Sequence, residues 1–124
     1  MTRRRAGLRQ LATSAAALFG TLIVVDGDTV KLNGRSYRLL GFDTPETYFA
    51  RCEQERQRGN AATARLKELI ATAETRLEPN GTGCKYGREC ARLLVNGEDV
   101  RDVMIREGHA RPYSGRGRKS DWCE

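Results

Sequence analysis

Several residue types and patterns that would decide the class of this protein are scarce or missing. The 124 residues contain one histidine, His109, and their four cysteines include no Cys-x-x-Cys pair. A structural zinc site usually needs closely spaced ligands, so this kind of site is not favoured. No apolar run approaches the roughly 20 residues that span a membrane. The chain is long enough for one domain with a single core, but not for two.

Acidic residues are absent from residues 1–25, whereas arginine is frequent there. The formal net charge of +6 comes from the two ends, because residues 18–110 carry 14 basic and 14 acidic groups. A positive charge is typical of nucleic-acid-binding proteins, but a neutral central region means that bulk charge identifies no partner. We interpret residues 1–18 as a basic leader, either an export signal or a disordered segment, and residues 114–124 as a basic tail.

The cysteines give a first indication of the compartment. Their number is even, and they are Cys52, Cys84, Cys90 and Cys123. Such a set in a small domain is typical of an oxidising compartment and of two disulfides. We therefore expect a secreted or periplasmic protein, with free thiols in a cytoplasmic protein as the alternative.

Short β-branched runs and turn signals indicate a mainly β domain. Asn33-Gly34 is a strong hairpin signal. Strands are predicted at residues 21–25, 29–32, 35–42, 75–78 and 88–95, with breakers ("PNGTG") after the fourth. A helix is predicted from a cap at Asn60 to about Glu74, after a polar loop over residues 47–59. A short helix follows Asn96-Gly97 and ends at Gly108.

This inventory predicts an α+β, mainly β fold. A five-stranded OB-fold barrel with one central helix and a second short helix fits it, over residues 19–113. The OB-fold presents a face suited to oligonucleotides, although a fold alone does not establish function.

The segment "VVDGDTVKLNGRSYRLLGFDTPET" concentrates acids in an otherwise apolar stretch. Asp26 and Asp28 are two residues apart, so in an extended chain they project to the same side. Asp43 and Glu46 bracket a Thr-Pro turn, in which proline biases Thr44 toward an extended shape that can aim its carbonyl outward. Carboxylates plus a carbonyl form the hard-oxygen set that Ca²⁺ prefers, while Mg²⁺ or Mn²⁺ would bind the same oxygens less productively. Solvated turn acids are the alternative.

Four segments resemble the staphylococcal nuclease (thermonuclease-like) family: "VDGDTVKL", "YRLLGFDTPET", "KYGR" and "VNGEDVRDVMIREGHA". They cover most of residues 19–113 in family order. The resemblance implies metal binding by Asp28, Asp43 and the Thr44 carbonyl, with Asp26 acting through water. It implies a base or water-orienting role for Glu46 and a phosphate clamp formed by Arg38 and Arg88. It also implies substrate contacts from Lys85, Tyr86 and Tyr113, with packing or simple exposure as the alternative for Tyr113.

By this resemblance we expect a calcium-dependent, sugar-nonspecific endonuclease. It would cut DNA and RNA, with single strands preferred, leave 3′-phosphate ends and act as a monomer. Two other functions are open: an OB module that holds single strands without cutting them, and a disulfide-stabilised interaction protein.

The loop after Thr47 and the basic tail depart from the family pattern, and Cys52 and Cys123 lie in these two places. From three possible connectivities we predict Cys52–Cys123, as a clasp on the tail, and Cys84–Cys90, around "KYGR".

Overall fold

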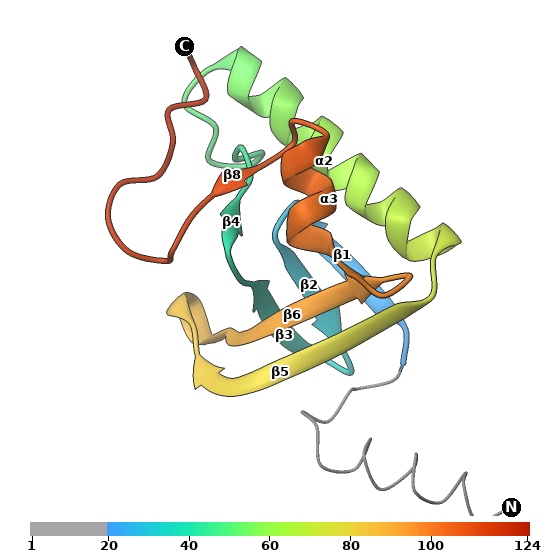
Figure 1. Cartoon of the computed structure of the whole chain (residues 1–124). Coiled ribbons are helices and arrows are strands. Elements are labelled where there is room, and N and C mark those ends of the chain that lie inside the picture. Colours follow the sequence, from blue (N-terminus) through green and yellow to red (C-terminus); the bar gives the residue numbers. More distant parts are fainter. Residues whose placement is uncertain (1–19) are drawn as a thin grey trace, which may run out of the picture.

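The computed structural model describes residues 20–124, so the predicted leader lies outside the described residues. Five strands of four or more residues form a mixed sheet in the order β1-β2-β3-β6-β5 (Figure 1). They are β1 (Leu22–Asp26), β2 (Thr29–Leu32), β3 (Arg35–Leu39), β5 (Thr75–Gly83) and β6 (Glu89–Val95). Strands β3 and β6 are parallel, and the other pairs are antiparallel.

Three two-residue strands complete the fold. β7 (Glu98–Asp99) pairs with β6, and β4 (Phe42–Asp43) pairs with β8 (Arg111–Pro112) in a separate small sheet. The β4–β8 pair holds Asp43 opposite Arg111, shortly before the C-terminal tail.

Helix α2 (Glu53–Thr72) begins well before Asn60, so the predicted start is wrong and the loop is shorter than expected. The Cys52 side chain caps the helix by accepting a hydrogen bond from the Glu55 N–H, and acidic residues in the first turn favour its dipole. Residues 53–59 carry no apolar periodicity, which is why they read as a loop. They are helical because good helix formers extend the segment and because Glu55 and Gly59 are buried against the rest of the domain.

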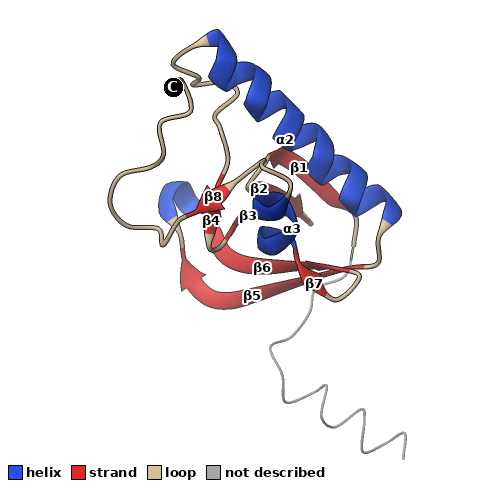
Figure 2. Ribbon diagram, turned by 45° about the horizontal axis from the view of Figure 1, so that its top comes forward, coloured by secondary structure: helices blue, strands red, loops and turns tan. Residues whose placement is uncertain are grey.

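Helix α3 (Val100–Arg106) begins at an Asp99 cap and is followed by Gly108, whose φ of +81° is the left-handed geometry expected for the stop. The sheet curves around α3, and α2 runs next to β1, so that both helices pack against one core (Figures 1 and 2). The core fills the space between them, and its largest fully buried side chains are Leu32, Leu39, Phe42, Leu66, Leu77, Leu93 and Met104. This α+β arrangement of a mixed sheet and two helices confirms the predicted fold class.

Two strand boundaries differ from prediction. The strand expected over residues 35–42 divides into β3 and β4, since the chain turns at Gly41, where φ is +91°. The strand expected to stop at Glu78 continues as β5 to Gly83, with a register shift between Pro79 and Gly83. The shift takes up the proline and glycine residues that would otherwise end the pairing.

The structure pairs Cys52 with Cys123 and Cys84 with Cys90, which is the predicted connectivity. The first bond brings the C-terminus beside the start of α2 (Figure 1). The second closes a small loop that contains the 3-10 turn η1 (Lys85–Gly87). Among residues 20–124, no helix has the length and apolar character needed to cross a membrane.

Candidate active site

The site begins at the tight turn between β1 and β2. The Asp28 N–H donates to Asp26 Oδ1 over 3.2 Å, so a turn brings these two aspartates together, rather than the extended strand that we predicted. A Cβ added at Gly27 would lie 2.6 Å from Thr44 Oγ1. Glycine therefore allows the turn to pack directly against Thr44, which follows β4.

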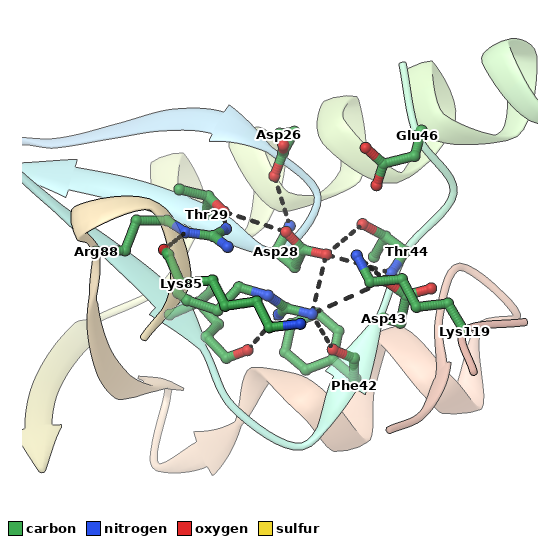
Figure 3. A network of polar contacts seen from close by, with 12 residues as sticks. Asp26, Asp28, Thr29, Phe42, Asp43, Thr44, Glu46, Lys85, Arg88 and Lys119 are labelled. Atoms are coloured by element: carbon green, nitrogen blue, oxygen red, sulfur yellow. Dashed lines mark hydrogen bonds and ion pairs between the residues drawn. The ribbon is translucent and has the colours of Figure 1, made fainter. Parts of the chain in front are cut away.

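Asp28 is the hub of the polar network (Figure 3). Its carboxylate is buried, with the residue only 5% exposed. Asp28 Oδ1 accepts from Thr29 Oγ1 at 3.1 Å. Asp28 Oδ2 accepts from the Thr44 hydroxyl at 3.3 Å and lies 3.5 Å from the Thr44 backbone nitrogen. The network thus joins the first hairpin to the chain after β4.

Asp43 lies beside Asp28 and is 2% exposed. Its Oδ2 accepts from Trp122 Nε1 at 3.4 Å, and its Oδ1 has no hydrogen-bond partner among the described residues. Lys119 Nζ lies 3.6 Å from Asp43 Oδ1. Burial raises the pKa of Asp43, against the opposing charge of Lys119. An incompletely satisfied, buried carboxylate oxygen is costly unless a cation or donor can reach it.

The guanidinium of Arg38 approaches both aspartates. Its Nη2 lies 3.4 Å from Asp28 Oδ2 and 3.8 Å from Asp43 Oδ1. Arg38 also donates to the backbone carbonyls of Leu39 and Phe42, at 2.5 and 2.9 Å. These contacts orient a mostly buried cation at the centre of the site.

Arg88 reaches the same network from the Cys84–Cys90 loop. Its Nη1 donates to Thr29 Oγ1 at 2.9 Å, and its Nε donates to the Lys85 carbonyl at 2.9 Å. Its guanidinium carbon lies 5.4 Å from the centroid of the Tyr86 ring. Thr29 therefore bridges Arg88 to Asp28, a role that we did not predict although Thr29 directly follows Asp28 in the sequence.

The expected substrate residues gather in one cavity beside these groups. Lys85, Tyr86 and Tyr113 line a cavity of about 150 Å³ together with Arg38 and Arg88. Tyr86 is 90% exposed and sits in the left-handed region at φ 62°. The Tyr113 hydroxyl donates to the Gly117 carbonyl at 3.2 Å, so that side chain also supports the turn of the tail.

Glu46 lies at the edge of the site, on the loop between β4 and α2 (Figure 3). Among residues 20–124 its carboxylate makes no hydrogen bond, in contrast to the other acids of the network. Burial raises the pKa of Glu46 against the opposing charge of Lys119, and neighbouring carboxylates raise it further. A raised pKa makes a carboxylate a better proton acceptor near neutral pH.

The backbone around Glu46 is held by a buried acid, Glu55, which no sequence motif marks. Glu55 is 2% exposed and accepts hydrogen bonds from the backbone N–H groups of Glu46 and Arg51, at 3.2 and 3.0 Å. A Cβ added at Gly59 would lie 2.6 Å from the Glu46 carbonyl oxygen. Helix α2 and this loop are therefore in close contact, and the early helix start is what places Glu55 there.

The donor set fits a hard divalent cation. Asp28 and Asp43 offer buried carboxylates, one of them with an oxygen that makes no hydrogen bond among the described residues, and Thr44 adds a backbone carbonyl as a candidate ligand. Burial and the charge of Asp28 raise the pKa of Asp26 to about 7. Such crowding of acids is relieved by a cation.

A family model for staphylococcal nuclease homologues matches residues 36–122. The chain belongs to the staphylococcal nuclease family. Over 94 residues it is 38% identical to endonuclease YncB of Bacillus subtilis (strain 168), covering 70% of this chain and 44% of YncB. It is 39% identical over 94 residues to the SPbeta prophage-derived endonuclease YokF of the same organism, covering 70% of this chain and 31% of YokF. The match spans less than half of either relative.

The match extends into the tail, beyond the domain end that we predicted at residue 113. Two tail side chains, Lys119 and Trp122, contact Asp43, and Trp122 is buried. From the sequence we predicted only that a Cys52–Cys123 disulfide holds the tail, and no site role for Lys119 or Trp122. In this member of the staphylococcal nuclease family, the tail thus forms part of the site.

Proposed function

We propose that the protein is a metal-dependent nuclease that hydrolyses phosphodiester bonds of DNA and RNA, with Ca²⁺ as its metal. The observation that carries this proposal is the pair of buried aspartates, Asp28 and Asp43, beside the guanidinium of Arg38. A scaffold protein gains nothing from burying two acids together when one carboxylate oxygen, Asp43 Oδ1, has cations at 3.6 and 3.8 Å but no hydrogen bond. Membership of the staphylococcal nuclease family and the names of the two Bacillus relatives support the same function.

Asp28, Asp43 and the Thr44 carbonyl would hold the metal, and Asp26 would act behind them, through the Asp28 backbone and through water. A bound divalent cation neutralises charge on a phosphodiester and lowers the pKa of water. Ca²⁺ is favoured over Mg²⁺ or Mn²⁺ because mixed carboxylate and carbonyl ligands suit its flexible coordination.

The side chains around the aspartates would perform the rest of the reaction. Arg38 and Arg88 would bind the scissile phosphate, because planar guanidiniums pair with two phosphate oxygens where charge develops. Glu46, with a raised pKa and an unengaged carboxylate, would accept or orient the proton of the attacking water. A general base typically contributes about 10²–10⁴-fold to the rate.

Substrate binding would involve the cavity of Lys85, Tyr86 and Tyr113. Exposed rings can stack on bases without reading their sequence, which favours single strands of either sugar type. Attack on the 5′ side of the phosphate would leave 3′-phosphate ends, as the family resemblance implies. We further propose a monomer in a secreted or periplasmic setting, which the two disulfides support.

The test is cleavage of denatured DNA and of an RNA oligonucleotide by the purified chain, in calcium and in excess chelator. We expect cleavage of both that chelator abolishes. Retention of the strands without cleavage in calcium would instead support a non-catalytic single-strand-binding module, and neither cleavage nor retention would support an interaction protein.

Two variants separate the proposed roles at the centre of the site. Asp43→Asn should lose calcium affinity and cleavage together, measured by calorimetric calcium titration beside initial rates. Glu46→Gln should lose about 10²-fold or more of the rate while calcium affinity falls only modestly. If Glu46→Gln lost calcium as badly as Asp43→Asn, Glu46 would be a ligand, and the base would lie elsewhere.

A further inference from the structure

Two aromatic side chains lie exposed on the loop that carries Glu46. Tyr48 and Phe49 are 88% and 75% exposed. Their rings meet edge to face with centroids 5.2 Å apart. Single exposed apolar residues are common, whereas adjacent large rings form a patch of the kind that marks a binding surface.

The patch borders the proposed catalytic centre. Phe49 lines a cavity of about 440 Å³ whose wall includes Asp43 and Glu46. Two exposed cationic residues of the tail, Arg118 and Lys119, line the same cavity. A flat ring beside cations is the combination that binds single-stranded nucleic acid, since the ring stacks on a base and the cations bind phosphates.

This cavity is distinct from the one that contains Tyr86 and Tyr113. Lys119 lines both cavities, so they adjoin along this side chain, whose Nζ lies 3.6 Å from Asp43 Oδ1. Glu46 and Arg88 lie on opposite sides of Asp28 (Figure 3). A strand whose phosphate lies over the aspartates would therefore extend toward Tyr86 in one direction and toward Phe49 in the other.

We propose that Tyr48 and Phe49, with Arg118, form a second nucleotide subsite on the Glu46 side of the scissile phosphate. The inference rests on the proposed nuclease function, and its ligand is a nucleotide of single-stranded DNA or RNA. A base within a duplex offers no free face, so the subsite discriminates against double strands. A lipid surface is a poorer occupant, because Phe49 shares its cavity with four acidic residues, Asp43, Glu46, Glu55 and Asp121, whose carboxylates would have to be desolvated.

The experiment is a binding cycle in the Glu46→Gln background with calcium, where cleavage is slowed about 10²-fold or more, so that binding is measured before the strands are cut. Fluorescence anisotropy measures the binding of a labelled single-stranded oligonucleotide. It also measures a series of the same oligonucleotide in which one nucleotide at a time lacks its base. The proteins are the background, Phe49→Leu, Tyr48→Leu and Ile23→Ala, the last a control for an exposed apolar side chain on β1. We expect Phe49→Leu to weaken binding by about 5-fold to 150-fold, the range for one lost stack, and Ile23→Ala to leave it unchanged.

The decisive result is coupling between ring and base. One abasic position should weaken binding to the background protein about as much as Phe49→Leu does, and the two changes combined should cost no more than either. Fully additive losses, or unchanged binding by Phe49→Leu, would overturn the subsite. The subsite would also be overturned if Phe49→Leu lost binding to anionic vesicles but bound the oligonucleotide as tightly as the background protein. Cleavage by the unmodified chain is scored separately, so a protein that shows the coupling but never cuts would refute the nuclease and retain the subsite.

Discussion

The contact between Gly59 and the Glu46 backbone makes a sharp test of how the site is built. Replacing a helix-interior glycine by alanine ordinarily stabilises a helix by about 1 kcal/mol. Here the new Cβ would lie 2.6 Å from the Glu46 carbonyl oxygen and 2.8 Å from the Pro45 carbonyl oxygen. Both are backbone atoms, so the loop must retreat by roughly 0.5–1 Å to reach ordinary contact distance.

The opposing effects set the expected magnitude. Overpacking of this kind typically costs about 1–3 kcal/mol, which offsets the helix gain. Gly59→Ala should therefore lower the free energy of unfolding by about 0–2 kcal/mol. The rate of strand cleavage should fall further, by up to roughly 10²-fold, because a displacement of about 1 Å takes Glu46 out of position.

The assay compares urea unfolding without reductant and initial cleavage rates for the parent, Gly59→Ala and Asn60→Ala. Asn60 is the exposed neighbour on α2, so its alanine variant gains helix propensity without touching the loop. We expect Asn60→Ala to be slightly more stable and fully active. If Gly59→Ala were also more stable by about 1 kcal/mol and cut at the parent rate, the close contact would not hold Glu46 in place.

Three other changes test separate parts of the site. Burial raises the pKa of Glu55, but hydrogen bonds from the Arg51 and Glu46 N–H groups outweigh burial and lower the pKa overall. The ionised Glu55 side chain therefore stabilises the folded protein above its unfolded-state pKa of about 4.3, and this stabilisation is lost as the pH falls. Glu55→Gln should thus lower the free energy of unfolding, measured with urea, by about 1–3 kcal/mol at pH 7 and by much less at pH 3. An equal loss at both pH values would show that the charge of Glu55 does not stabilise the fold. The double variant Cys52→Ala and Cys123→Ala removes a disulfide between cysteines 71 residues apart and should lower the free energy of unfolding by about 4 kcal/mol. It should also weaken calcium binding measured by calorimetry. Unaltered stability would contradict the proposal that this disulfide holds the tail. Arg88→Lys keeps the charge but loses the fork, so cleavage should slow about 10²-fold at unchanged calcium affinity; a native rate would remove Arg88 from the clamp.

Local features of the fold could be predicted because short-range sterics decide them. The Asn33-Gly34 hairpin forms with both residues at positive φ, 52° and 81°, which few other residue pairs adopt. The stop at Gly108 follows the same rule. Helix α2 could be predicted only in its second part, where Leu66 and Leu69 face the core, because its first part gains its helical state from burial of polar residues.

The acidic residues of the candidate site could also be predicted from the sequence alone. Asp26, Asp28, Asp43 and Glu46 lie within one short segment whose spacing resembles a known family, and the same resemblance indicated the arginines. Tertiary structure decided what surrounds them. Lys119 and Trp122 reach Asp43 only because the tail is paired through β8 and tied to Cys52. Contacts between such distant segments depend on how the whole chain packs, whereas a turn or a cap depends on a few neighbouring backbone angles.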